Sequence, residues 1–237
     1  QSVLGSRLVD RVADLMRTGE QPGESILGEF ENITPWFGRM LEAKFGPFFR
    51  DNVLPKIDVF EKIDEASGRV LDLGCGNGWY LRELAANYGD LTGLGIDAIA
   101  DGIDQADEAA SEQGLAERLE FRCTDIFEFQ ADAPFDAIVL NRTLHHLWGR
   151  RDDLLEVVDA CLADDGSLLV WEPAYPAERT ELRNPRKQML GMRNLAEHAM
   201  QNRLLEPEEV RETLAELDLE VDLHAIDEVE TLFVGRR

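Results

Sequence analysis

An acidic residue and three glycines lie at the end of an apolar run, in residues 70–78, Val-Leu-Asp-Leu-Gly-Cys-Gly-Asn-Gly. The glycines occupy every second position after the acid. Glycine has no Cβ, so this backbone can turn sharply and a ligand can lie against it. Asp72 lies in this stretch, and Asp97 ends the next apolar run. A carboxylate at a strand end can accept both hydrogen bonds of a ribose diol. The pattern predicts a nucleoside-binding turn. The alternatives are an ordinary strand-to-helix turn and a nucleotide dehydrogenase, whose Gly-x-Gly-x-x-Gly spacing is absent.

A second group of reactive side chains follows two later apolar runs. His145 and His146 come shortly after the run that ends at Asn141, and Glu172 ends the run after it. Strand ends in open α/β sheets face the ligand crevice. A histidine there could accept a proton from a hydroxyl or ammonium group, and Glu172 could orient that group. The alternatives are a histidine pair that packs around the strand end and a salt-bridged carboxylate. No further histidine or cysteine lies close by in sequence, so no metal site is predicted.

The order of the motifs resembles that of one enzyme family. Asp72-x-Gly74-x-Gly76-x-Gly78, then Asp97, then Cys123-Thr124-Asp125-Ile126 are similar to the motifs of the class I S-adenosylmethionine-dependent methyltransferases. The resemblance covers about residues 68–237. It implies that S-adenosylmethionine is the cofactor, and that the chain holds an acceptor in line with the methyl group of a sulfonium. That transfer needs no metal.

The resemblance also implies which residues hold the cofactor. Asp72 would anchor the methionine amine, Asp97 would bind the ribose hydroxyls, and Asp125 would meet the adenine amine. Asp125 could instead cap its own loop, as aspartate often does. The full implied set is Asp72, Gly74, Cys75, Gly76, Asp97, Ala98, Thr124, Asp125, Ile126 and Asn141.

The elements that must position these residues alternate along the chain. Apolar runs predict strands at 69–73, 91–97, 119–124, 136–141 and 167–172, and near 220–226 and 230–235. Amphipathic spacing predicts helices at 78–88, 99–113, 151–162 and 207–217. This alternation predicts a doubly wound α/β fold. The resemblance implies a seven-stranded, mostly parallel sheet with an antiparallel C-terminal hairpin.

Residues 1–67 precede the core, residues 68–237, and predict a helical N-terminal cap. Apolar residues at 4, 8, 12 and 15 have helical spacing, and an aromatic segment that includes Trp36 and Phe37 follows. These aromatic residues either pack on the core or form a lid in which Trp36 and Phe37 contact the substrate. We expect a chain that lacks residues 1–50, if it folds, to keep the cofactor site and to lose methyl transfer.

Residues 174–204 form an insert between the fifth strand and the last helix. This insert contains six basic residues and only three acidic residues. A guanidinium matches a carboxylate or phosphate with two hydrogen bonds, so Arg179 and Arg183, with Tyr175, are expected to bind an anionic acceptor. The alternative is a helix held by salt bridges to acidic neighbours.

The charge of the chain limits its partners. With 48 acidic and 24 basic residues the net charge is −24, which opposes binding to nucleic-acid phosphates. Only four residues are lysine, a composition that indicates adaptation to high salt or, more simply, high solubility. No run approaches the roughly 20 apolar residues of a membrane span. We expect a cytoplasmic protein without nucleic-acid or membrane partners.

These observations together predict methyl transfer from S-adenosylmethionine to a small-molecule acceptor. Methylation of a macromolecule, such as tRNA or protein, is one alternative. A module that binds S-adenosylmethionine without turnover is another. The acceptor atom and the oligomeric state do not follow from the sequence, nor does it follow whether the sulfonium serves a reaction other than methyl transfer.

Overall fold

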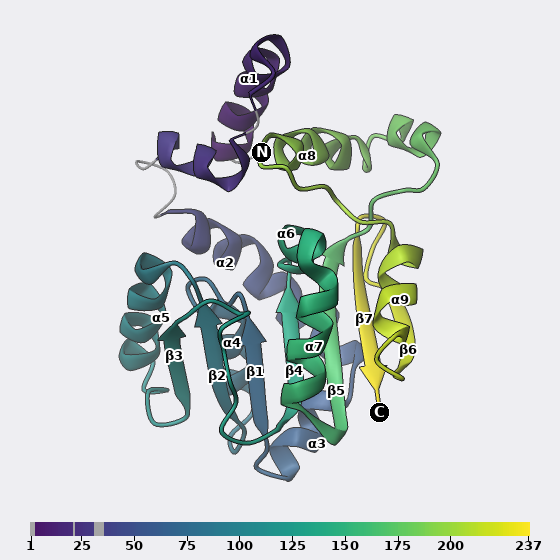
Figure 1. The fold of residues 1–237 in the computed structure, drawn as a ribbon. Coiled ribbons are helices and arrows are strands. Elements are labelled where there is room, and N and C mark those ends of the chain that lie inside the picture. The colour runs from purple at the N-terminus through teal and green to yellow at the C-terminus, as the bar shows by residue number, and fades with distance from the viewer. Residues whose placement is uncertain (1–2, 21, 31–35) are drawn as a thin grey trace.

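A seven-stranded sheet forms the centre of the molecule in the computed structural model, which describes residues 3–20, 22–30 and 36–237 (Figure 1). The strand order is β3-β2-β1-β4-β5-β7-β6. Strands β1 to β5 pair in parallel, whereas β7 is antiparallel to both β5 and β6. The predicted doubly wound α/β fold with an antiparallel C-terminal hairpin is confirmed.

The elements follow the predicted alternation closely. The strands are β1 Arg69–Leu73, β2 Thr92–Asp97, β3 Leu119–Cys123, β4 Phe135–Asn141, β5 Leu162–Pro173, β6 Glu220–Ala225 and β7 Glu230–Arg236. The α-helices are α1 Val3–Thr18, α2 Phe37–Phe48, α3 Val59–Glu65, α4 Trp79–Asn87, α5 Ala100–Glu112, α6 Leu144–Leu147, α7 Arg151–Cys161, α8 Gln188–Ala199 and α9 Pro207–Ala215. Short 3-10 or π segments lie at Gly23–Phe30, Phe49–Val53, Leu54–Lys56, Trp148–Arg150 and Arg179–Arg183.

Both faces of the sheet are buried, because successive strand residues point to opposite sides. In β4, Val139 belongs to the core that includes residues of α3, α4 and α5. Its neighbours Ile138 and Leu140 belong to the core that includes residues of α7 and α9. This two-sided burial explains the uninterrupted apolar runs, which are typical of parallel sheets.

The N-terminal helices pack in two different places. Helix α1 lies against α8 (Figure 1), and Leu8 and Val12 share a small cluster with Ala196 and Ala199. Helix α2 and the turn after it instead join the main core, where Phe49 is fully buried. Deletion of residues 1–50 would remove part of this core, so retention of the cofactor site stays a prediction that depends on whether the shortened chain folds.

The predicted division between residues 67 and 68 remains a proposal, and residues 1–2, 21 and 31–35 of the predicted cap lie outside the described ranges. Within those ranges, no helix has the length and apolar character needed to cross a membrane.

Candidate active site

The carboxyl ends of β1 and β4 mark the crevice of this sheet. The two strands are neighbours, with Asp72 paired to Val139, but the chain leaves them toward opposite edges of the sheet. In open α/β sheets ligands bind at such a reversal, outside the strand ends. Helices α2, α6 and α8 lie above these ends (Figure 1), so residues from distant parts of the chain meet there.

The turn after β1 is shaped by glycines that no other residue could replace easily. Gly74 has a φ of +77°, and a Cβ on it would lie 2.4 Å from Cγ2 of Thr143. Gly76 has a φ of +54°, and the described structure has no heavy atom within 4 Å of the place where its Cβ would lie. The backbone at Gly76 is therefore open to a ligand, in a conformation that glycine adopts at little cost.

Asp97 holds this turn against β2. Its carboxylate accepts hydrogen bonds from the backbone N–H groups of Gly76, at 2.8 Å, and Ile99, at 2.9 Å. Each carboxylate oxygen has further acceptor capacity for hydroxyl groups of a ligand. Ala98 is exposed beside it, and the Ile99 side chain is 63% exposed. Ile99 was not among the residues predicted from the sequence, although an exposed apolar residue two positions after the strand end is a usable signal.

Asp72 is the most unusual carboxylate of the crevice. Its side chain is 1% exposed, and neither oxygen has a hydrogen-bond partner in the described part of the chain. Burial, together with the nearby charge of Asp97, raises the pKa of Asp72 from its ordinary 3.8 to about 8. A buried carboxylate is costly unless it is paired with a cation. Asp72 is thus suited to a positively charged group that enters the crevice.

Four more residues implied to bind the cofactor differ in whether their side chains are buried. Cys75 is buried, so its thiol packs in the core. Asp125 is exposed and accepts a hydrogen bond from the Phe127 N–H at 2.8 Å, which caps its own loop. Thr124 lies half-buried before it, whereas Ile126 is buried in the core with its side chain. Of these four residues, Thr124 and Asp125 are the two whose side chains are not buried.

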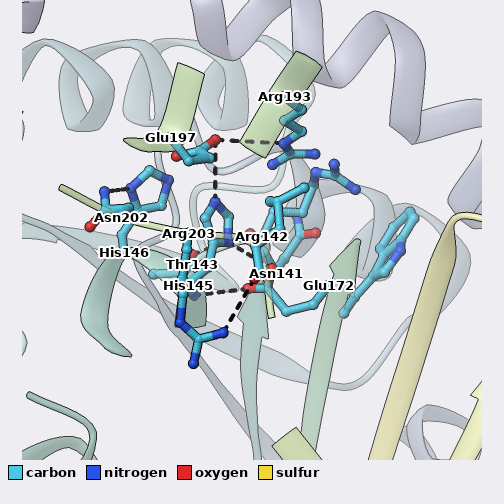
Figure 2. Close-up of polar contacts among 12 residues, drawn as sticks. Asn141, Arg142, Thr143, His145, His146, Glu172, Arg193, Glu197, Asn202 and Arg203 are labelled. Atoms are coloured by element: carbon cyan, nitrogen blue, oxygen red, sulfur yellow. Dashed lines mark hydrogen bonds and ion pairs between the residues drawn. The ribbon is translucent and has the colours of Figure 1, made fainter. Parts of the chain in front are cut away.

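His145 lies between two carboxylates (Figure 2). Its Nδ1 is 2.7 Å from Oε2 of Glu172, and its Nε2 is 3.6 Å from Oε1 of Glu197. The backbone N–H of His145 also donates to Glu172, at 3.3 Å. Burial alone lowers the pKa of His145, but Glu172 and Glu197 outweigh it and raise the value to about 10. In this arrangement His145 therefore carries a proton on both ring nitrogens and acts as a donor.

Two predicted reactive residues thus meet a third that the sequence did not indicate. Glu197 comes from α8 in the insert, is 6% exposed, and also lies 3.6 Å from Nε of Arg193. The ring of His146 lies beside that of His145, with centroids 4.2 Å apart and planes tilted by 38°, and its Nδ1 is 2.9 Å from the Asn202 amide (Figure 2). No local pattern connects α8 to the end of β4, so only the tertiary structure places Glu197 here.

A second buried ion pair supports the floor of the crevice. Arg142, in a left-handed conformation with φ of +61°, contacts Glu230 at 2.5 Å and lies over the ring of Phe45 at 4.1 Å. Trp171 donates its indole N–H to the same carboxylate of Glu230 at 3.1 Å. These contacts fix the segment between Asn141 and His145 relative to β7 and α2.

The predicted substrate residues lie in less enclosed positions. Trp36 and Phe37, at the start of α2, are 62% and 39% exposed. Tyr175 is half-buried, whereas Arg179 and Arg183 are exposed on the short helix of the insert. Within the described residues, no hydrogen bond or ion pair joins either arginine to His145, His146 or Glu172.

The other basic residues of the insert pair with acids. Arg186 pairs with Glu228, Lys187 with Glu181 and Arg203 with Glu209, each at 2.6 Å. These pairs favour the salt-bridge alternative for this part of the insert.

Comparisons with known proteins agree with this geometry. Residues 70–166 match the model of a family described as a methyltransferase domain. In sequence, the chain is 29% identical over 143 residues to a carboxy-S-adenosyl-L-methionine synthase from Nautilia profundicola, a match that covers 60% of this chain and 59% of that protein. The chain thus matches about three fifths of the length of this relative.

Solved structures show the same fold at low sequence identity. An O-methyltransferase family protein from Burkholderia thailandensis has a TM-score of 0.77 at 18% identity, over 99% of this chain and 69% of that one. The O-methyltransferase NcsB1 from neocarzinostatin biosynthesis, in complex with S-adenosyl-L-homocysteine and 1,4-dihydroxy-2-naphthoic acid, has a TM-score of 0.72 at 21% identity, over 97% and 68%. These structures show the fold, and the match of residues 70–166 to a methyltransferase domain confirms the resemblance seen in the sequence.

Proposed function

We propose that this chain, which matches a methyltransferase domain at residues 70–166 and has the fold of O-methyltransferases, is an S-adenosylmethionine-dependent enzyme that methylates a small molecule. One observation carries the proposal: the buried Asp72 carboxylate lacks a partner among the described residues, beside an open glycine turn at the crevice. The cofactor would supply a methyl group activated on a sulfonium. It also carries an ammonium group, which is the partner that Asp72 lacks.

Different residues of the crevice would bind different parts of the cofactor. Asp72 would pair with the amine, and Asp97 would accept the ribose hydroxyls while it holds the glycine turn. Ile99, exposed next to Asp97, would cover an apolar face of the adenine, with Thr124 and Asp125 at its edge. Most of this framework is present before binding, which reduces the entropy lost when the ligand is ordered.

The acceptor side would be formed by His145 and the helices above it. Exposed apolar side chains on α2 and α8, including Phe37, Met40 and Met192, could contact an apolar acceptor. His145 and Arg193 supply positive charge in the same region. The complex of NcsB1 holds a naphthoic acid with two hydroxyl groups. We propose an acceptor of that chemical class, with an apolar body and an anionic group.

The function is tested with labelled S-adenosylmethionine and an extract of small metabolites. Label in a metabolite supports the proposal, and label confined to tRNA or protein would favour methylation of a macromolecule. Retention of the cofactor without any transfer would favour a binding module. The net charge of −24 argues against nucleic-acid substrates.

Asp97→Ala is expected to weaken S-adenosyl-L-homocysteine binding by about 1–3 kcal/mol or more. The change removes a charged acceptor for the ribose and releases the N–H groups of Gly76 and Ile99. Isothermal titration calorimetry measures the affinity, and Asp101→Ala, an exposed acid on α5, is the control. Equal affinity in the Asp97 variant and the unchanged chain would refute this role.

Arg193→Gln is expected to raise the KM for a carboxylate-bearing acceptor roughly tenfold, because a charge-assisted contact is lost. Arg193 reaches Glu197 at the site, whereas Arg183 is exposed on the short helix of the insert. Arg183→Gln is the matched comparison, because the sequence predicts that Arg183 binds the anion, whereas we expect the KM of this variant to stay unchanged. A KM that rises in neither variant, or in the Arg183 variant alone, would show that Arg193 does not bind the anion.

A further inference from the structure

We infer that His145, His146 and Glu197 form a binding site for a first-row divalent cation that favours imidazole ligands, such as zinc. Ligand atoms of the three residues all lie within 4.8 Å of one another. His145 Nε2 and Glu197 Oε1 are 3.6 Å apart, close to the separation of about 3.3 Å between two ligands of a tetrahedral zinc ion. Small side-chain rotations would bring the third ligand into the same sphere.

Each histidine already has an outer partner on Nδ1. Glu172 lies 2.7 Å from Nδ1 of His145, the arrangement that orients most metal-bound histidines. The Asn202 amide lies 2.9 Å from Nδ1 of His146. A half-turn of that amide would place its oxygen there as an acceptor. The cation would displace the proton on Nε2 of His145. The site would then take Nε2 from both rings, with Nδ1 held by a second residue in each case.

Buried polar atoms at the centre of this cluster point to a missing ligand. His145 Nε2 and Glu197 Oε2 have no hydrogen-bond partner within the described ranges, and their residues are only 1% and 6% exposed. The contacts of Glu197 with His145 and Arg193 are both at Oε1, at 3.6 Å, so a cation beside His145 could also be bound by Oε2 of the same carboxylate. Buried groups of this kind are stable when they are hydrogen-bonded or when they coordinate a metal.

The cation site also indicates which class of molecule accepts the methyl group. This inference rests on the proposed function. Three protein ligands leave a coordination position open, as in catalytic rather than structural zinc sites. The hydroxyl oxygen of an acceptor could occupy that position, where the cation would lower the pKa of the hydroxyl. The sequence predicted no metal site because Glu197 follows the histidine pair by about 50 residues and belongs to another helix.

Cobalt binding tests the site without any methyl donor or acceptor. The full chain is first treated with a chelator and then titrated with Co²⁺, and visible absorption from low-symmetry coordination is expected. Glu197→Gln and His146→Gln should each weaken Co²⁺ binding at least a hundredfold, and Glu172→Gln, which acts through His145, roughly tenfold to a hundredfold. His198→Gln, an exposed histidine on α8, is the matched control and should bind as the unchanged chain does.

Unchanged affinity in the Glu197 variant, or absorption typical only of hydrated cobalt, would overturn the site. If a variant fails to fold, X-ray absorption of the unchanged chain loaded with Zn²⁺ decides instead. Two imidazole ligands around the zinc ion support the proposal, and the absence of imidazole ligands would overturn it. Because no turnover is measured, failure of the metal site is distinguishable from failure of methyl transfer.

Discussion

Phe49→Ala is expected to lower the free energy of unfolding by about 3–5 kcal/mol, a large part of the stability of a single domain. The Phe49 side chain is completely buried. Its ring centroid lies 4.4 Å from that of Tyr80 and 6.0 Å from that of Trp171. Because these neighbours are rigid and come from different elements, they could not collapse into the cavity. Urea denaturation followed by circular dichroism measures the loss.

Phe37→Ala is the control, since it removes the same side chain at the start of α2. Phe37 is 39% exposed, so the expected loss is below about 1 kcal/mol. Similar losses in the two variants would contradict the placement of Phe49 in the core.

The same packing decides where the chain can be shortened. Deletion of residues 1–50 would remove Phe45 and Phe49 from the core, and Glu42 from its contacts with Asn77 and Arg82, both at 2.8 Å. Asn77 belongs to the glycine turn, so α2 supports the cofactor site directly. We expect this deletion to abolish folding as well as activity.

Asp72→Asn is expected to stabilise the ligand-free protein at pH 8 by about 2–4 kcal/mol and to weaken cofactor binding. Asp72 has a pKa near 8 when folded, because it is buried and close to Asp97, against an ordinary value of 3.8. Between these values the folded state keeps a proton that the unfolded state has lost. The contribution of Asp72 to stability is therefore present at pH 4 and lost as the pH rises to 8.

Urea denaturation at pH 5, 6.5 and 8 measures this loss. The unchanged chain should lose stability over this range more steeply than the Asp72→Asn variant. Binding of S-adenosyl-L-homocysteine to the variant should weaken at least tenfold, because its amine loses a charged partner. Asp125→Asn, at an exposed loop, should change the slope little. Parallel pH profiles for the Asp72 variant and the unchanged chain would contradict the burial of an unpaired carboxylate.

The sheet, the order of its elements and the place of the crevice could all be predicted from local features of the sequence. Apolar runs and glycine spacing are local signals, and the connection between parallel strands follows general rules of handedness and adjacency. The side chains at strand ends, Asp72, Asp97, His145 and Glu172, could be named because parallel strands bring their carboxyl ends to one edge. That these four side chains lie near one another therefore follows from the topology of the sheet.

The contacts that these side chains make could not be predicted, because they depend on how distant helices pack. Glu197 meets His145 because α8 folds back over the end of β4, and Glu42 meets Asn77 because α2 packs against α4. Nothing in the residues of α8 or α2 specifies these partners. The orientation of such helices depends on packing between surfaces that are distant in sequence, as between α1 and α8. Contacts of this kind depend on shape and burial over the whole domain, which local residue patterns do not encode.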